Sequence, residues 1–169
     1  YTQRSSPPNG TELLFDGKPI AKAFGFKVYI PPVGDMVVVA VTGGANGHPL
    51  SFLVVNGKKV PGSETVERGL IEKVIFSADG KHYAALCVDT TNHHYVFADG
   101  KRGEEYAAVN DLAFTGDSSA VVYQAIANGK MFVVIGDHEY GGAGIGALNG
   151  PVIAAAGSHV GASMTVNGR

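Results

Sequence analysis

Long apolar runs and clusters of basic residues are both absent from this sequence. No stretch reaches the roughly 18 to 20 uninterrupted apolar residues that a membrane-spanning helix requires. Lys and Arg total 13 against 15 Asp and Glu, and the basic residues are nowhere concentrated. Nucleic-acid phosphates and anionic membrane surfaces both require a concentrated basic face. We therefore expect no nucleic-acid partner and no direct insertion into a membrane.

Cysteine is almost absent as well. The single Cys87 cannot form an internal disulfide, so cysteine content does not identify the compartment. It lies in an apolar run, where a thiol is a small buried hydrophobe and not a nucleophile. The first residue is Tyr1 rather than Met, which fits a cleaved signal peptide and equally proteolysis or truncation. We expect a periplasmic or extracellular location, with the cytoplasm as the alternative.

Glycine and proline are plentiful and scattered. The chain has 169 residues, 45% of them hydrophobic, and its 24 Gly and 8 Pro separate short apolar runs. Gly and Pro in such positions are typical of turns, and no 3.6-residue periodicity marks a helix. The composition therefore predicts a globular, all-β protein built from many short strands.

The short apolar runs repeat along the chain. Five copies of a strand that enters a Gly-centred turn are "LLFDGKPI" (13–20), "FLVVNGKKV" (52–60), "YVFADGKRG" (95–103), "FVVIGDHEY" (132–140) and "SMTVNGR" (163–169). A second element, "VIFSADGKHYAAL" (74–86), is echoed by "LAFTGDSSAVVY" (112–123). The spacing of roughly 32 to 43 residues is in the range of solenoids and propellers. The chain is therefore expected to be an array of one small unit.

The repeated unit is predicted to be a β-meander. In the unit 52–94 we expect strands at about 52–55, 70–77 and 81–88, with a fourth at 94–98 leading onward. Asn56-Gly57 and Asp79-Gly80 are the strongest signals for tight hairpin turns, in which both central residues have positive φ. The middle strands, such as "YAALCV", are apolar on successive residues, so both faces must be covered. We expect small sheets that stack face to face, as blades do around an axis.

Residues 52–140 resemble the WD-repeat-like bacterial β-propeller family, with its Phe-Ser-x-Asp-Gly-Lys repeats. The resemblance implies about four four-stranded antiparallel blades, with units at 13–51, 52–94, 95–131 and 132–163 and a further unit that starts at 164–169. Residues 1–10 are interpreted as an N-terminal arm or linker, and 11–169 as propeller repeats. Pro31-Pro32 and the Ala-Ala-Gly of the last unit depart from the family pattern. A partial propeller within a longer polypeptide is the simplest account, and a closed four-bladed ring is the alternative.

No pattern in the sequence specifies a reaction. His48, His82, His93, His94, His138 and His159 have no carboxylate or Cys at ligand spacing, so we interpret them as polar loop residues and expect no metal site. "GGAGIG" (141–146) lacks the helix and the Lys of a phosphate-binding loop, and is interpreted as a connector. Glu104-Glu105 are interpreted as a solvated strand edge. We expect no catalytic residue, no cofactor and no small-molecule ligand.

The remaining candidate for function is the surface. Aromatic and Arg residues anchor protein interfaces more often than other types. The candidate interaction residues are Phe24, Phe26, Tyr29, His93, His94, Tyr95, Arg102, Tyr106 and Tyr140. For each aromatic residue, the alternative is that the ring only packs between blades.

Since no catalytic pattern is found, we expect a non-catalytic binding or structural module, a propeller platform for protein–protein interaction within a larger protein or assembly. The alternative function is a propeller that accompanies a hydrolase or peptidase whose catalytic part lies outside this chain.

Overall fold

The computed structural model describes residues 2–5, 11–42, 51–63, 69–144, 148–153, 157 and 159–164, and all of its regular elements are strands. The all-β prediction is confirmed. Among these residues there is no helix that is long and apolar enough to cross a membrane. The first two antiparallel sheets contain seven strands: β1 (Thr2–Ser5), β2 (Thr11–Phe15), β3 (Lys18–Ala23), then β4 (Gly25–Tyr29), β5 (Val38–Thr42), β6 (Phe52–Val55) and β7 (Lys58–Lys59).

Two further four-stranded antiparallel sheets and a terminal hairpin follow. Each sheet is a meander in which neighbours in sequence are neighbours in space. Their strands are β8 (Leu70–Phe76), β9 (Tyr83–Val88), β10 (His94–Ala98), β11 (Lys101–Arg102), β12 (Ala108–Phe114), β13 (Val121–Ala127), β14 (Lys130–Ile135), β15 (His138–Gly144), β16 (Leu148–Ile153) and β17 (Val160–Met164). Three sheets thus have the four strands predicted, whereas the first has three and the last has two.

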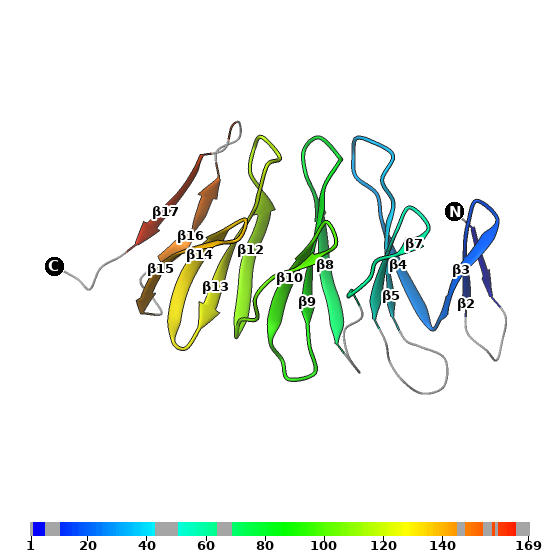
Figure 1. Cartoon of the computed structure of the whole chain (residues 1–169), viewed down its shortest axis with the longest axis horizontal. Helices are drawn as coiled ribbons and strands as arrows, with labels where there is room; N and C mark the ends of the chain where they lie inside the picture. Colours follow the sequence, from blue (N-terminus) through cyan, green and yellow to red (C-terminus); the bar gives the residue numbers. More distant parts are fainter. Residues whose placement is uncertain are drawn as a thin grey trace.

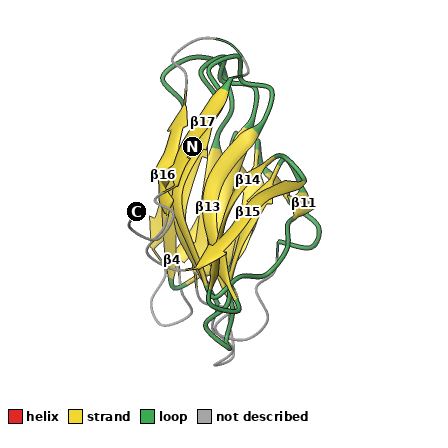
Figure 2. Cartoon of the chain, turned by 90° about the vertical axis from the view of Figure 1, so that its left-hand side faces the viewer, coloured by secondary structure: helices red, strands yellow, loops and turns green. Residues whose placement is uncertain are grey.

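The sheets lie in a row, one face against the next (Figure 1). Viewed along the row, they overlap almost completely (Figure 2). The sheet β1–β3 and the hairpin β16–β17 lie at opposite ends of the row, and no strand of one pairs with a strand of the other in the described ranges. The row is therefore open, and the alternative of a closed four-bladed ring within this chain is not found.

The apolar middle strands are covered on both faces, as predicted. All six residues of β9 are buried. Its side chains alternate between two clusters: Ala85 and Cys87 pack with residues of the sheet β4–β7, whereas Ala84 and Leu86 pack with residues of the sheet β12–β15. Successive side chains of a strand point to opposite faces, so one strand contributes to two cores. A third cluster, which includes Leu13, joins the sheet β1–β3 to the sheet β4–β7.

The sheets are offset from the predicted units. The strands expected at 52–55, 70–77, 81–88 and 94–98 are present as β6, β8, β9 and β10. However, β6 pairs with β5 and β7, and not with β8. The predicted boundaries at 52, 95 and 132 therefore fall inside sheets. Turn motifs identify hairpins locally, but they do not show after which hairpin the chain crosses to the next sheet.

The N-terminal arm also needs correction. Residues 2–5, which were expected to belong to a linker, form β1 and pair with β2 from Thr2 opposite Leu14 to Ser5 opposite Thr11. Residues 1 and 6–10 of the predicted arm lie outside the described ranges, as do 165–169 of the predicted last unit.

The repeated Ser/Thr-x-Asp motif closes the turn after the first strand of two sheets. Ser77 Oγ donates to Asp79 Oδ1 at 2.5 Å and accepts from the backbone N–H of His82 at 3.0 Å. In the next sheet, Thr115 Oγ1 donates to Asp117 Oδ1 at 2.7 Å and accepts from the N–H of Ala120 at 3.0 Å. In each turn, the hydrogen bond from the hydroxyl group is the main cause of a lowered pKa of the aspartate that accepts it.

These turns lie next to one another along one edge of the stacked sheets, the upper edge in Figure 1. The Cα of Gly80 lies so near the preceding sheet that an added Cβ would be 1.9 Å from the carbonyl oxygen of Val33. On the other side, the N–H of Asp79 donates to Ser118 Oγ at 3.3 Å, and the N–H of Asp117 donates to the carbonyl of Gly157 at 3.2 Å. We call residues 33–34, 79–80, 117–118 and 157 the stacked turns.

Candidate binding groove

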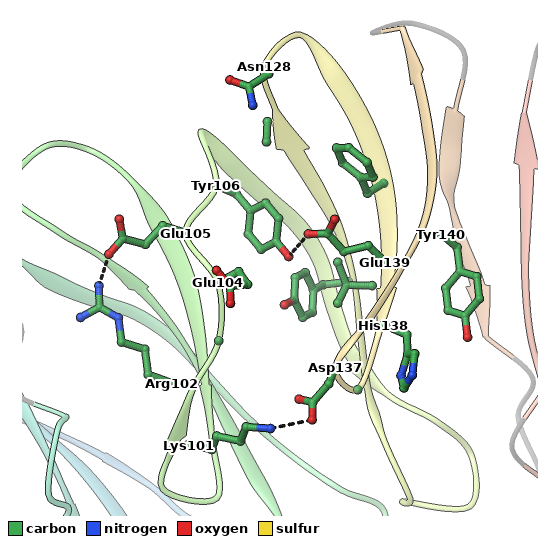
Figure 3. A pocket seen from close by; sticks show the side chains of 16 residues that line it. Lys101, Arg102, Glu104, Glu105, Tyr106, Asn128, Asp137, His138, Glu139 and Tyr140 are labelled. Atoms are coloured by element: carbon green, nitrogen blue, oxygen red, sulfur yellow. Dashed lines mark hydrogen bonds and ion pairs between the residues drawn. The ribbon is translucent and has the colours of Figure 1, made fainter.

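A groove of about 860 Å³ lies between two neighbouring sheets (Figure 3). One wall is the segment 101–106, which contains β11 and the chain that follows it. The other wall comes from the sheet β12–β15, mainly from residues 132–140. Its size is in the upper part of the range for ligand pockets and exceeds what a single side chain needs.

The register of the sheet explains why the second wall is hollow. Tyr123 lies opposite Val134, and Val134 lies opposite Glu139, so these three side chains form one row on the same face. In the next row, Phe132 lies opposite Gly141, which has no side chain. A Cβ added to Gly142 would be 3.2 Å from Phe132 Cε1, so the ring occupies the space beside the glycine. The glycines thus leave an aromatic surface uncovered by side chains of β15.

"GGAGIG" is therefore not the connector that was predicted. Gly141–Gly144 belong to β15, and the pairing register shifts between Met131 and Phe132, opposite these glycines. Gly141 and Gly142 have φ values of 109° and 91°, which favour glycine. A Gly-rich stretch in a strand often marks such an irregularity, and this was the sequence signal for the groove wall. The three residues 145–147 lie outside the described ranges.

Two ion pairs connect the groove residues. Lys101 Nζ lies 2.5 Å from Asp137 Oδ2 and so bridges the two sheets, and the pairing is the main reason why the pKa of Asp137 is lowered. Both side chains are 71% exposed, so the pair contributes little to stability. Arg102 pairs with Glu105 at 2.5 Å within the first wall, and its guanidinium lies 3.9 Å above the ring of Tyr95.

A tyrosine pair forms the floor of the groove. Tyr106 is 3% exposed, and its hydroxyl donates to Glu139 Oε1 at 2.6 Å across the sheet interface. Its ring meets that of Tyr123 edge to face, with centroids 6.1 Å apart. Burial first, and then the hydrogen bond to Glu139, raise the pKa of Tyr106 well above its ordinary value. The phenol therefore stays protonated and keeps Glu139 pointing into the groove.

The groove has more carboxylates than cations. Lys101 and Arg102 are paired with Asp137 and Glu105, which leaves Glu104 and Glu139. Within the described part of the chain, no Lys, Arg or His nitrogen lies within ion-pair distance of either of these two carboxylates. The solvated strand edge expected at Glu104-Glu105 is thus also the acidic side of a groove.

The structure brings together three of the nine predicted interaction residues, because Arg102, Tyr106 and Tyr140 all line the groove. The Tyr140 side chain is 54% exposed, but Tyr140 is the neighbour of Glu139 on β15, so its ring lies on the other side of that strand from the Glu139 carboxylate (Figure 3). Tyr95 is 1% exposed and packs in the core below Arg102, as the alternative for aromatic residues anticipates.

The other predicted residues lie elsewhere. Phe24 is 69% exposed at the start of the second sheet, while Phe26 and Tyr29 of β4 are partly buried against core clusters. His94 is partly buried on β10, and its Nδ1 has no partner within the described residues. These residues do not share a site with the groove.

His93 has carboxylates near it that the spacing analysis missed. Ligand atoms of Asp89, His93 and Glu105 lie within 4.8 Å of one another. Asp89 precedes His93 by four residues in the β9–β10 loop, and this i, i+4 spacing was the overlooked signal. A nitrogen and two carboxylates suit several divalent cations. However, His93 Nδ1 is already hydrogen-bonded to Thr91 Oγ1 at 2.8 Å, and the Glu105 carboxylate already forms an ion pair with Arg102. Asp89, His93 and Glu105 therefore belong to a polar loop network.

Cys87 and His82 have structural environments. Burial raises the pKa of Cys87 to about 12, and the residue is 2% exposed, so the prediction that it lies buried in an apolar strand is confirmed. His82 Nδ1 lies 2.6 Å from Asp99 Oδ2 on the neighbouring hairpin, and the same carboxylate accepts from the N–H of Tyr83. No nucleophilic side chain is hydrogen-bonded to the ring of His82 among the described residues.

Comparisons of this chain with protein-family models, with curated proteins and with solved structures found no match.

Proposed function

We propose that this chain is a non-catalytic binding module, a propeller-like platform for protein–protein interaction within a larger protein or assembly. Stacked antiparallel sheets that share their cores make a rigid support, and rigid supports hold binding residues in place without an entropic cost at each encounter. The proposal treats the open row of sheets as an arc of a propeller. Its support is the face-to-face stacking of four-stranded meanders together with the repeat resemblance.

The groove between β11 and β15 carries the proposal. It combines the Phe132 ring, which no side chain of β15 covers, with carboxylates and an Arg, and such mixed aromatic and charged surfaces are typical of protein interfaces. Its floor is fixed by the Tyr106–Glu139 hydrogen bond. A surface that is already held in one conformation loses little freedom when a partner binds.

Site-specific photo-crosslinking tests the proposal. A photoreactive amino acid is placed at Lys101, which lines the groove and has a side chain that is 71% exposed, and separately at Ile30, which is 65% exposed outside the groove. We expect a discrete crosslinked protein in the source cells from position 101 and none from position 30. The identified protein, once purified, should bind the wild-type chain and the variant Ile30→Ala equally, and should bind Glu104→Ala more weakly.

Two results would overturn the proposal. One is a set of crosslinks that is the same at both positions, because the groove would then not be a preferred contact. The other is a crosslink to a catalytic domain of the same natural polypeptide, which its intact mass would reveal. That result would instead support a module that accompanies a hydrolase.

A further inference from the structure

We infer that the occupant of the groove is a basic segment of a partner protein, whose Arg or Lys side chains bind between Glu104 and Glu139. The inference rests on the proposed function and specifies the chemistry of the partner. It depends on three features of the groove: its uncompensated charge, its aromatic surfaces and its size.

The charge arrangement favours a cation. The four carboxylates of the groove face two permanent cations, Lys101 and Arg102, both already paired at 2.5 Å. His138 also lines the groove, but its ring is not within ion-pair distance of a carboxylate of the described residues. Glu104 lies on the first wall and Glu139 on the second, so a guanidinium or ammonium group between them would interact with both sheets (Figure 3). Because Glu139 already accepts a hydrogen bond from Tyr106 at 2.6 Å, it is oriented before the partner arrives. An anionic partner would instead meet two carboxylates with no balancing cation.

The aromatic side chains favour the same partner. Cations bind over the faces of tyrosine and phenylalanine rings, and Arg does so more often than Lys. Within this chain, Arg102 already lies 3.9 Å above the Tyr95 ring, next to the groove. Phe132 lies opposite Gly141, so no side chain of β15 covers its ring, and it offers an aromatic surface inside the groove.

The size and the apolar side chains of the groove favour a protein segment over a small cation. A volume of about 860 Å³ has room for several side chains, and the partly buried Phe132 and Ala127 add apolar surface beside the carboxylates. A polyamine offers charge but no apolar side chains for that surface. A segment in which basic residues alternate with apolar ones satisfies both parts of the groove.

Fluorescence anisotropy with defined peptides tests the inference. The probe is a fluorescein-labelled eight-residue peptide in which Arg alternates with Val. The reference peptide contains citrulline in place of each Arg, which keeps the planar shape and some of the N–H donors but removes the charge and replaces one guanidinium nitrogen with a carbonyl oxygen. We expect the Arg peptide to bind, the citrulline peptide to bind at least about tenfold more weakly, and the affinity for the Arg peptide to fall as salt is added.

Charge-matched variants locate the binding site. The variant E104Q/E139Q removes the two unpaired carboxylates, while the amide oxygen introduced on β15 can still accept the Tyr106 hydrogen bond. We expect roughly tenfold weaker binding of the Arg peptide, since each exposed ion pair contributes a factor of about three to five. The control D35N/E72Q removes the same charge at exposed positions outside the groove and should bind as the wild type does.

Each outcome separates this inference from the proposed function. If the citrulline peptide binds as tightly as the Arg peptide, or if both double variants weaken binding equally, the basic-partner inference is wrong. If spermine alone binds as tightly as the Arg peptide, the occupant is not a protein segment. The platform proposal still stands in these cases when the crosslink from position 101 is observed, and it fails without that crosslink whatever the peptides do.

Discussion

Replacement of Gly80 by alanine should weaken the contact between two neighbouring sheets. Gly80 belongs to the stacked turns and has a φ of 68°, and an added Cβ would lie 1.9 Å from the carbonyl oxygen of Val33 and 2.7 Å from its carbonyl carbon. Both atoms are backbone, so no side-chain rotation relieves the overlap. The two turns must move apart.

The magnitude has two parts. A left-handed backbone costs an alanine about 1–2 kcal/mol relative to glycine. Forcing extra atoms into a packed contact costs about 1–3 kcal/mol more. Gly129 separates the two parts, because its φ of 70° is nearly the same while a Cβ there meets nothing within 4 Å. We expect Gly129→Ala to lower the free energy of unfolding by about 1–2 kcal/mol, and Gly80→Ala to lower it by about 2–5 kcal/mol.

Urea unfolding followed by far-UV circular dichroism measures both variants against the wild type. The m-value should stay unchanged, so that the midpoint reports stability. Equal losses in the two variants would refute the reasoning, since they would mean that the Val33 contact does not hold the sheets together. A loss in neither would show that the positive φ values are not those of the folded chain.

Three further predictions concern the core and the turns. Cys87 should not react with a thiol reagent at about pH 8 in the folded protein and should react fully in urea, because burial raises its pKa to about 12. Fast labelling of the folded chain would show that the thiol is not buried. Asp79 has a lowered pKa in the folded state, so the stability that it contributes is present above the ordinary pKa of 3.8 and is lost as the pH falls below that value. The variant Asp79→Asn should therefore be less stable than the wild type at pH 6 and similar to it at about pH 2. A stability difference that does not change with pH would argue against this linkage. Phe97→Ala should lower the free energy of unfolding by about 3–5 kcal/mol because the ring is 1% exposed, whereas Phe24→Ala, at a side chain that is 69% exposed, should change it by less than about 0.5 kcal/mol.

Local chemistry made much of the fold predictable. Asn56-Gly57 forms the tight turn that its residue types favour, with positive φ at both positions. Asp79-Gly80 does not, because only Gly80 has a positive φ and the connection from β8 to β9 spans residues 77–82. The unbroken apolar run of β9 correctly predicted a strand covered on both faces. Such features depend on residues close together in sequence, and each repeat tests the interpretation of the others.

Long-range arrangement was less accessible. The predicted units cut β6 and β10 away from the sheets to which they belong, because the turn motifs on either side of a cut are equally good hairpins. The open ends of the row and the strand at 2–5 depend on pairings that local patterns do not encode.

The groove shows the same limit. Glu104 and Glu139 are distant in sequence, and Tyr106 reaches Glu139 only because two sheets stack in a particular register. Arg102, Tyr106 and Tyr140 could be proposed from residue type alone. Their common location, and the role of Gly141 in exposing Phe132, required the three-dimensional arrangement.

The division of β9 between two cores has a mechanical consequence. If an interior sheet unfolds, both neighbouring sheets lose the apolar contacts that they make with it. A destabilising substitution in one sheet should therefore destabilise the adjacent sheets most and more distant sheets less, as in linear repeat arrays with nearest-neighbour coupling. Unravelling should then begin at the two outermost sheets and move inward, and the middle of the molecule should be the last part to exchange its amide hydrogens with solvent.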